Sequence, residues 1–403
     1  MTQRFPAGPQ SMLRAINSRA VLEIIAVEGP LTRTELAGRT GLSKPSISAM
    51  LAALLDRGAV QEVGQVSGRK GPAAVLYQVA PDCAWSVGID IGHDRLRVAV
   101  ADVTGTVRAS QTADVRRTRA GLVRQVRNCT AAVLGQVGLG VADVDQVVVG
   151  VPGVVGPDGR ELSYADALPD DGAGLGEALD AAFPAPVVLE NDVNLAALAE
   201  HSLGKGVDVD DFVLLSLGVG IGLGVVVHGR LHRGASGAAG EVGYLPHFQP
   251  TVRVAAPPLT RDPLEPYVGA RAVVALGQEA GLGADLTARQ VFDLARAGNE
   301  VATGVVEETA RALAYVVACV APVVDPARVV LGGAIGSNGD LLLEPVARHL
   351  SELSPFHPAL VSSDLGADAV LLGATAMATE LARDSAFAAL TSTSPTPLLL
   401  QES

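Results

Sequence analysis

Small polar and basic side chains gather at two points in the first 80 residues of the chain. Lys44-Pro45-Ser46-Ile47-Ser48 directly follows Ser43, a residue type that favours the start of a helix. Backbone N–H groups at a helix start and the Lys44 ammonium attract phosphate, and the Ser46 and Ser48 hydroxyls can reach base edges. Ser67-Gly68-Arg69-Lys70-Gly71-Pro72 carries two cations with little bulk beside them, which suits a narrow minor groove. This chemistry predicts DNA as a ligand.

The elements that must position these residues follow the pattern of a winged helix-turn-helix. A first helix is predicted over 11–28, where apolar residues recur at close to the helical period: Leu13, Ile16, Ala20, Ile24 and Val27. Thr32-Arg33-Thr34-Glu35 is a capping box, and the short helix that it opens should end at Gly41. Ser43 caps a third helix that runs to about Arg57, with Ile47, Met50, Leu51, Leu54 and Leu55 inward. Strands over 60–66 and 74–79 form the wing.

In such a unit the second helix of the turn enters the major groove. The predicted DNA-binding residues are therefore Arg33, Thr34, Lys44, Ser46, Ser48, Arg69 and Lys70. The alternative is a small helical interaction domain with an ordinary solvated charged loop.

Charge is distributed unevenly along the 403 residues, which carry 30 Lys and Arg against 43 Asp and Glu, a net charge of −13. Residues 1–80 hold nine basic and five acidic side chains, net +4, so the rest of the chain carries −17. A basic head before an acidic body indicates two different partners, one of them a polyanion. With 48% hydrophobic and 18% charged residues, the chain is not a disordered acidic protein.

Several other classes of protein are excluded by the sequence. The longest apolar runs, such as 314–324, fall short of the roughly 18 residues of a membrane span, and the N-terminus lacks the apolar region of a signal peptide. We therefore expect a cytoplasmic protein without a membrane partner. Cys83, Cys129 and Cys319 are isolated, so neither a disulfide framework nor a cysteine zinc site is indicated.

After a linker at 81–85, the pattern changes to strands that alternate with helices. Strands at 86–93 and 96–103 flank Gly92, and a helix at 119–136 and a strand at 146–151 follow. The second half repeats this scheme with strands at 212–217 and 222–228, a helix at 301–320, and a strand at 327–331 that enters Gly332-Gly333. Glycine-rich turns such as Gly218-Val219-Gly220-Ile221-Gly222 bring backbone N–H groups close to a ligand, often a phosphate, or only make sharp hairpins. Turn chemistry alone leaves both interpretations open.

The body resembles the ROK family, which comprises repressors, open reading frames of unknown function and sugar kinases. The resemblance runs from about Gly88 to Thr379 and rests on these segments: Asp90-Ile91-Gly92, Gly150-Val151-Pro152-Gly153, residues 190–197, residues 217–224, residues 229–243, Leu264-Glu265 and Leu331-Gly332-Gly333-Ala334. It implies an α/β fold in which an N-terminal winged helix-turn-helix (1–80) precedes a two-lobed actin-like domain, a duplicated ribonuclease-H-like domain of ATPase type. We expect the first lobe at 86–205, completed by a C-terminal helix near 371–388, the second lobe at 206–370, and a disordered tail at 391–403.

The resemblance also implies a sugar site between the lobes. In the family's kinases the Asp of an Asn-Asp pair accepts the proton of the attacking sugar hydroxyl, and Asp192 holds this position. Such a carboxylate serves as a general base or as an acceptor for a sugar diol. The implied sugar-binding residues are Gly153, Asn191, Asp192, Glu241, Tyr244 and Glu265, with Tyr244 in place of the family's histidine. Alternatively, Asn191 and Asp192 cap a helix, and Glu241 and Glu265 are solvated turn acids.

The nucleotide loops depart from those of the family's kinases. The first loop reads Asp90-Ile91-Gly92-His93-Asp94-Arg95 instead of Asp-x-Gly-Gly-Thr-Lys, and the second reads Gly218-Val219-Gly220 instead of Gly-Thr-Gly. Phosphoryl transfer depends on positioning and on charge stabilisation, so these changes argue against the use of ATP. The degenerate loops comprise Asp90, Gly92, Gly218, Gly220, Gly222, Gly332 and Gly333. The stretch 245–263 contains no cysteine, so we expect neither the zinc ion that many family members hold nor any other cofactor.

Together these features predict a sugar-responsive transcriptional regulator that represses genes of carbohydrate uptake or metabolism. A sugar or phosphosugar would bind between the lobes and change the affinity for a palindromic operator, which a homo-oligomer would occupy. Two alternatives are an active ATP-dependent sugar kinase with a DNA-binding head and an interaction protein whose body only dimerises.

Overall fold

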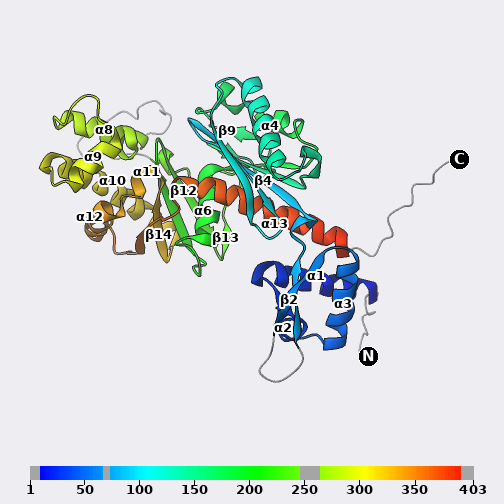
Figure 1. Ribbon diagram of the computed structural model, residues 1–403. Coiled ribbons are helices and arrows are strands. Elements are labelled where there is room, and N and C mark those ends of the chain that lie inside the picture. Colours follow the sequence, from blue (N-terminus) through cyan, green and yellow to red (C-terminus); the bar gives the residue numbers. More distant parts are fainter. Residues whose placement is uncertain (1–9, 67–72, 246–263, 392–403) are drawn as a thin grey trace, which may run out of the picture.

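The computed structural model describes residues 10–66, 73–245 and 264–391. Along the chain it forms a small head followed by two α/β lobes, and a long C-terminal helix runs from the lobes to the head (Figure 1). Arg69 and Lys70, the two cations expected at the wing tip, and residues 392–403 of the expected tail lie outside the described residues.

The head has the element order that the sequence predicts. Its elements are α1 (Gln10–Glu28), β1 (Leu31–Thr32), α2 (Arg33–Thr40), α3 (Lys44–Asp56), β2 (Val60–Val66) and β3 (Ala74–Val79). Local signals account for the boundaries. Thr32 and Glu35 form the capping box at the start of α2, and Gly41 ends that helix in the left-handed conformation. The Ser43 side chain accepts a hydrogen bond from the Ser46 N–H and so caps α3.

In α1, three of the apolar residues that the sequence pattern predicts to be buried are exposed. Leu13 and Ile16 are each 55% exposed and Val27 is 74% exposed, whereas Val21, Leu22 and Ile25 are buried. The reason is geometric. A helix of 19 residues is about 28 Å long, so both of its ends, with Leu13 and Ile16 at one and Val27 at the other, extend past the core of a head this small. The inward face of α3 is as predicted, because Ile47, Met50, Leu51 and Leu54 are buried and Leu55 packs against the same cluster.

The first lobe is built around a five-stranded sheet in the order β10-β7-β4-β5-β6. Its strands are β4 (Trp85–Ile91), β5 (Arg95–Asp102), β6 (Val107–Asp114), β7 (Gln146–Val151) and β10 (Val187–Asn191). The neighbours β4, β5 and β6 are antiparallel, whereas β7 runs parallel to both β4 and β10. Helices α4 (Arg119–Gln136) and α5 (Leu175–Asp180) and the short pair β8 (Val154–Val155) and β9 (Leu162–Ser163) complete this part.

The second lobe repeats this topology with a sheet in the order β13-β12-β11-β14-β15. Its strands are β11 (Phe212–Leu217), β12 (Ile221–Val227), β13 (Arg230–Leu231), β14 (Arg328–Gly332) and β15 (Ala359–Ser362). The accompanying helices are α7 (Glu265–Val268), α8 (Ala270–Glu279), α9 (Ala288–Arg296), α10 (Glu300–Val324), α11 (Gly333–Gly336) and α12 (Gly339–Leu353). In both lobes an antiparallel meander is followed by two parallel strands. The predicted duplicated α/β fold is therefore confirmed.

Two helices connect the lobes. Helix α6 (Asp192–Leu203) follows β10 of the first lobe and packs on β11 and β12 of the second. The long helix α13 (Ala369–Thr391) packs on α6 and on β4 and β7, and Figure 1 shows it in orange and red between the lobes. Glycine permits this close crossing, because a Cβ at Gly373 would lie 1.8 Å from the Leu195 carbonyl oxygen.

The predicted linker region contains a short 3-10 helix, η1 (Pro81–Cys83), before β4 begins at Trp85. Ala84 is buried in the same apolar cluster as the head's core, so the chain at this junction is packed against the head. Among the described residues, none of the helices is long and apolar enough to cross a membrane.

Candidate functional site

The turn from β10 into α6 carries the Asn-Asp pair. Asn191 is the N-cap of α6: its side-chain oxygen accepts a hydrogen bond from the Asn194 N–H at 3.0 Å. Its amide nitrogen donates to the Gly153 carbonyl at 3.0 Å, which fixes the cap against the turn after β7. Asn191 therefore has the capping role that the sequence left as an alternative. Because Asn191 is the N-cap, Asp192 is the first residue of α6.

Asp192 lies between the two lobes, with other carboxylates on both sides. Part of its surface is accessible, but the surrounding protein displaces water from the carboxylate, and this desolvation is the main reason why its pKa rises to about 7. The negative charges of Asp90 in the first lobe and Glu241 in the second raise the pKa further. The Val193 N–H, which donates to Asp192 Oδ1 at 2.8 Å, opposes the shift. Near neutral pH this side chain is thus poised between the donor and acceptor forms of a carboxyl group.

Gly153, Glu241 and Tyr244 are linked to this turn through Asn191 and through the charge of Glu241. Gly153 has a φ of 136° and lies against the loop after β9, since a Cβ there would be 2.8 Å from the Ala165 Cβ. Glu241 precedes the 3-10 helix η4 (Val242–Tyr244), and its carbonyl accepts the Tyr244 N–H at 3.2 Å. The structure brings together Gly153, Asn191, Asp192, Glu241 and Tyr244.

Glu265 is the first residue of α7, and its side chain lies outside the described residues. The backbone around it is fixed near the site, because the Leu264 N–H donates to the Gly243 carbonyl at 3.0 Å. This contact brings the start of α7 next to Tyr244.

A buried ion pair that the sequence analysis did not single out supports the Asn-Asp turn. Glu190 is 3% exposed and accepts hydrogen bonds from the Asn191 N–H at 2.9 Å and from Asn194 Nδ2 at 3.0 Å. The other carboxylate oxygen of Glu190 accepts a hydrogen bond from Arg233 Nε of the second lobe at 2.5 Å. The pair therefore holds the start of α6 to the loop after β13. Both residues belong to the motifs of the resemblance, but their pairing depends on the tertiary fold.

The first nucleotide loop contains a second pair that the sequence analysis missed. Asp90 is 1% exposed on β4, and Arg97 stands opposite it on β5. Arg97 Nη2 lies 2.5 Å from Asp90 Oδ2. Burial raises the pKa of Asp90, and the Arg97 guanidinium opposes that rise. The buried acid of the first loop is thus paired with a cation of the protein itself.

The rest of this loop is also held by side chains. The Gly92 N–H donates a hydrogen bond to the Arg95 carbonyl at 2.9 Å and so closes the β4–β5 hairpin. Asp94, expected to intrude on the phosphates, pairs with Arg117 Nη2 at 2.7 Å and with His93 Nδ1 at 2.9 Å. These partners hold the pKa of Asp94 below its ordinary value, so it stays ionised at the loop's tip.

The glycines of the second loop fall into two groups. Gly218 and Gly220 have open space around them, and the Gly218 N–H donates to the Gly220 carbonyl at 2.9 Å. Gly222 lies against α6 instead, because a Cβ would be 2.8 Å from Val193 Cγ2. Gly332 and Gly333 pack on β11, with a Cβ of Gly333 only 2.3 Å from the Leu217 carbonyl oxygen. Three of the five glycines thus have packing roles that help to position Asp192 or the end of β11.

In the head, the N-terminal turn of α3 is accessible. Lys44 and Ser46 are exposed and Ser48 is half-buried, while the Ser46 hydroxyl lies 2.8 Å from that of the capping Ser43. Thr34 is exposed on α2. Arg33 is exposed as well, but its guanidinium lies 5.2 Å from the centre of the Tyr77 ring and donates to the Tyr77 hydroxyl.

Among the described residues, no group of three or more His, Cys, Asp or Glu side chains could hold a metal ion. The segment in which family members hold zinc falls mostly on residues 246–263, outside the described part of the chain.

Comparisons with known proteins agree with this architecture. A family model described as "ROK family" matches residues 86–381, and one described as "IclR helix-turn-helix domain" matches residues 17–64. A xylose repressor of Caldicellulosiruptor bescii is 26% identical, over 92% of this chain and 97% of its own length. The N-acetylglucosamine repressor of Escherichia coli O157:H7 is 24% identical, over 84% of this chain and 85% of its own length.

A solved structure shares the whole architecture. A ROK family transcriptional regulator, a homologue of the E. coli MLC protein, superposes with a TM-score of 0.75 at 22% identity and covers 94% of this chain and 98% of its own. At this identity the likeness shows the fold alone. Because the family model covers well over half of the sequence, this chain belongs to the ROK family, and its N-terminal head is a helix-turn-helix domain of the IclR type.

Proposed function

We propose that this protein is a sugar-responsive transcriptional regulator, a repressor of carbohydrate uptake or metabolism genes. The head binds operator DNA through α3 and the wing, and the cleft around Asp192 binds a sugar or phosphosugar that changes operator affinity. Its relatives in the family include proteins named as xylose and N-acetylglucosamine repressors.

The observation that carries this proposal is the continuity between the sugar site and the head through α13. One end of α13 crosses α6 where Gly373 meets Leu195, and Leu195 lies three residues after Asp192 in α6. The other end enters the head's core, where Ala382 and Phe387 join the same apolar cluster as Ile25 and Leu51. A helix of 23 residues spans about 34 Å, so one rigid element touches both sites.

Polar contacts fix the head to this helix. Arg19 of α1 pairs with Asp384 at 2.5 Å, and Arg57 at the end of α3 donates to the Leu390 carbonyl. Arg383 donates to the Val103 carbonyl at 2.9 Å, which holds the same stretch of α13 to the first lobe. A sugar that draws Asp192 and Glu241 together shifts the lobes, and α13 transmits that shift to the recognition helix. In a dimer the shift changes the spacing of two heads whose half-sites lie about one helical turn apart.

We expect no kinase activity, and the Asp90–Arg97 pair in the first loop supports this expectation. A phosphoryl-transfer site needs open coordination beside its acid and donors aimed at phosphate oxygens. Arg97 neutralises Asp90, and the exposed Val219 brings no hydroxyl to the second loop. Asp192 then serves as a hydrogen-bonding partner of the sugar hydroxyls rather than as a catalytic base.

Two measurements on the full chain test the proposal. Genomic DNA fragments selected at about 150 mM salt should yield a palindromic consensus, and the Lys44→Ala variant should bind it less tightly because a phosphate contact is lost. A coupled assay of ADP formation across hexoses, pentoses and amino sugars should show no turnover above that of Asp192→Asn. Selection that yields no consensus contradicts the regulator, and sugar-dependent ADP formation abolished by Asp192→Asn supports the kinase instead.

A further inference from the structure

Two tyrosines, one from each lobe, meet beside the carboxylate site. The ring of Tyr164, in the loop after β9, lies 5.7 Å from that of Tyr244 in η4, at an interplanar angle of 70°. This is the edge-to-face arrangement that aromatic pairs favour. Only 5 of the 403 residues are tyrosines, so the meeting of two at one place is a notable concentration of aromatic surface.

The backbone holds Tyr164 in a conformation that is costly for a bulky residue. Its φ is 52°, in the left-handed region that favours glycine, and its side chain is 66% exposed. Strain of this kind is kept where the surrounding structure requires it, often at ligand sites. On either side of Tyr164, the Ser163 carbonyl and Ala165 pack against Gly153 and leave no room for a Cβ at that glycine.

The pair is joined to the carboxylate site by short connections on both sides. Gly153, which supports the Tyr164 loop, accepts the hydrogen bond from Asn191, the residue before Asp192. Tyr244 donates its N–H to Glu241, whose charge acts on Asp192. A ligand held by the two carboxylates therefore has two partly exposed aromatic rings as its neighbours, at 66% and 37% exposure.

A cavity borders the strand β9 that precedes Tyr164. It has a volume of about 410 Å³ and is lined by polar groups from both lobes: Arg160, Glu161, Ser163, Glu177 and Ser236. This volume lies within the range of about 300–1,000 Å³ for small-molecule sites. The segment that carries Tyr164 thus packs against Gly153, which is hydrogen-bonded to Asn191, and borders this polar cavity at Ser163.

We infer that the effector is an oligosaccharide of at least two units, with Tyr164 and Tyr244 forming an aromatic subsite for the second unit. The first unit hydrogen-bonds Asp192 and Glu241. The C–H face of the second unit packs on the tyrosine rings, and its hydroxyls reach the polar cavity. The inference rests on the proposed sugar-binding function and adds the length of the ligand.

The experiment measures binding of matched pairs of sugars to the full chain by titration calorimetry. Each pair is a monosaccharide and the disaccharide built from it: glucose with cellobiose and with maltose, xylose with xylobiose, and N-acetylglucosamine with N,N′-diacetylchitobiose. The variants are Tyr164→Ala and Tyr244→Ala, with Tyr164→Phe and Tyr244→Phe to keep the rings. Phe356→Ala is the matched control, since Phe356 is a 48% exposed aromatic between α12 and β15.

We expect one disaccharide to bind at least about tenfold more tightly than its monosaccharide, which is the effect of one or two well-packed ring contacts. Both Ala variants should remove that preference, and Tyr164→Ala, which lies outside the implied sugar-binding residues, should keep the monosaccharide affinity. The Phe variants and Phe356→Ala should preserve the preference. Thermal unfolding of each variant checks the fold. Equal affinity for the two members of every binding pair, or a preference that survives in both Ala variants, overturns the inference and leaves the proposed function intact. Failure of all these sugars to bind contradicts the sugar-binding function itself, and the inference with it.

Discussion

Replacement of Asp192 by Asn should make the protein more stable at alkaline pH while it impairs sugar binding. The pKa of Asp192 rises from its ordinary 3.8 to about 7 in the folded protein. Between these values the folded state binds the proton more tightly than the unfolded state, so the wild type loses stability as pH rises through this window. Asn keeps an oxygen for the Val193 N–H but has no charge to desolvate.

The size of the effect follows from proton linkage. With these two pKa values, the raised pKa of Asp192 costs about 2 kcal/mol of folding free energy at pH 5 and about 4 kcal/mol at pH 8. These are upper limits, because part of the side chain is accessible to water. The stability advantage of Asp192→Asn should therefore grow by up to about 2–3 kcal/mol between pH 5 and pH 8. At about 2 °C per kcal/mol for a domain of this size, Tm should differ by up to about 4–6 °C more at pH 8.

Calorimetric scans of both proteins at pH 5, 6, 7 and 8 provide the test. Asp158→Asn is the control, because backbone N–H groups of Arg160 and Glu161 lower the pKa of Asp158 and its titration lies below pH 5. The Tm difference of that variant should not change across the series. If the difference between wild type and Asp192→Asn is equally flat, desolvation and the neighbouring carboxylates do not act on Asp192 as described.

Three further substitutions test other parts of the structure. Arg97→Gln leaves Asp90 buried without its cation and should lower the free energy of unfolding by about 3 kcal/mol, measured by urea unfolding. Gly373→Ala forces a methyl group against the Leu195 carbonyl and should cost about 2 kcal/mol or more in the same assay. Lys44→Ala should reduce the slope of log affinity for operator DNA against log salt concentration by about one.

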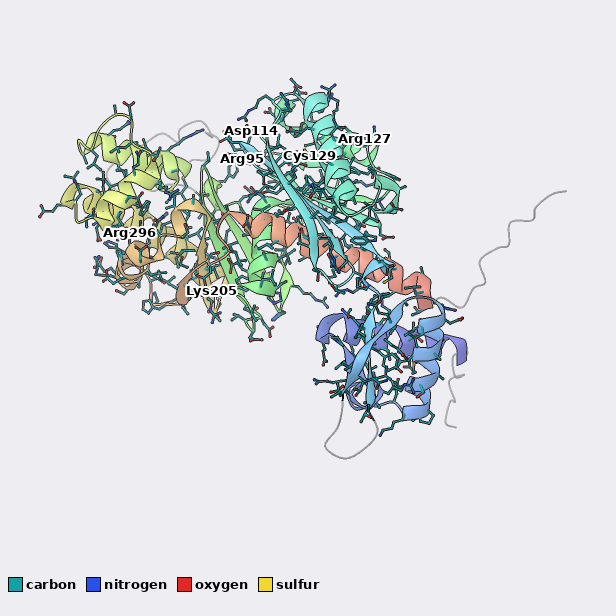
Figure 2. The ribbon with its side chains drawn as sticks, viewed as in Figure 1. Arg95, Asp114, Arg127, Cys129, Lys205 and Arg296 are labelled. Atoms are coloured by element: carbon teal, nitrogen blue, oxygen red, sulfur yellow. The ribbon has the colours of Figure 1, made fainter. Side chains whose placement is uncertain are left out.

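Each substitution has a matched control. Arg95 pairs with Asp114 at 3.6 Å on the exposed end of the same sheet, where Figure 2 labels both, so Arg95→Gln should cost less than about 1 kcal/mol. Gly304 lies inside α10 with nothing within 4 Å of a Cβ, and Gly304→Ala should be neutral or stabilising. Arg311, an exposed arginine of the same helix, should leave the salt slope unchanged when replaced by Ala. Equal effects of a variant and its control would refute the corresponding argument.

Local signals in the sequence predicted much of the fold. The Thr32–Glu35 capping box, the Gly41 cap and the strands of the wing lie where the residue types indicate, because capping and turn chemistry act over three or four residues. The buried face of α1 differs from the predicted one, since burial of a helix depends on what packs against it and both ends of α1 lie outside the core of the head. Periodicity alone could not show that.

The candidate site was predictable in its motifs but not in its pairs. The hairpin around Gly92 was expected, and counting outward from its turn would have placed Arg97 opposite Asp90. The Glu190–Arg233 pair and the Tyr164–Tyr244 contact join segments that are 43 and 80 positions apart and come from different lobes. Their partners are set by lobe packing, which no local pattern encodes.

The most direct test of the account measures whether a sugar changes the affinity of the protein for its own operator. The operator is first selected from genomic DNA, and its binding is then followed by fluorescence anisotropy at fixed salt with and without each sugar of the matched pairs. The account predicts that at least one sugar changes operator affinity by about tenfold or more in the wild type and not in Asp192→Asn, which should still bind the DNA. Operator affinity that is the same with and without every sugar that binds the protein would contradict the coupling through α13.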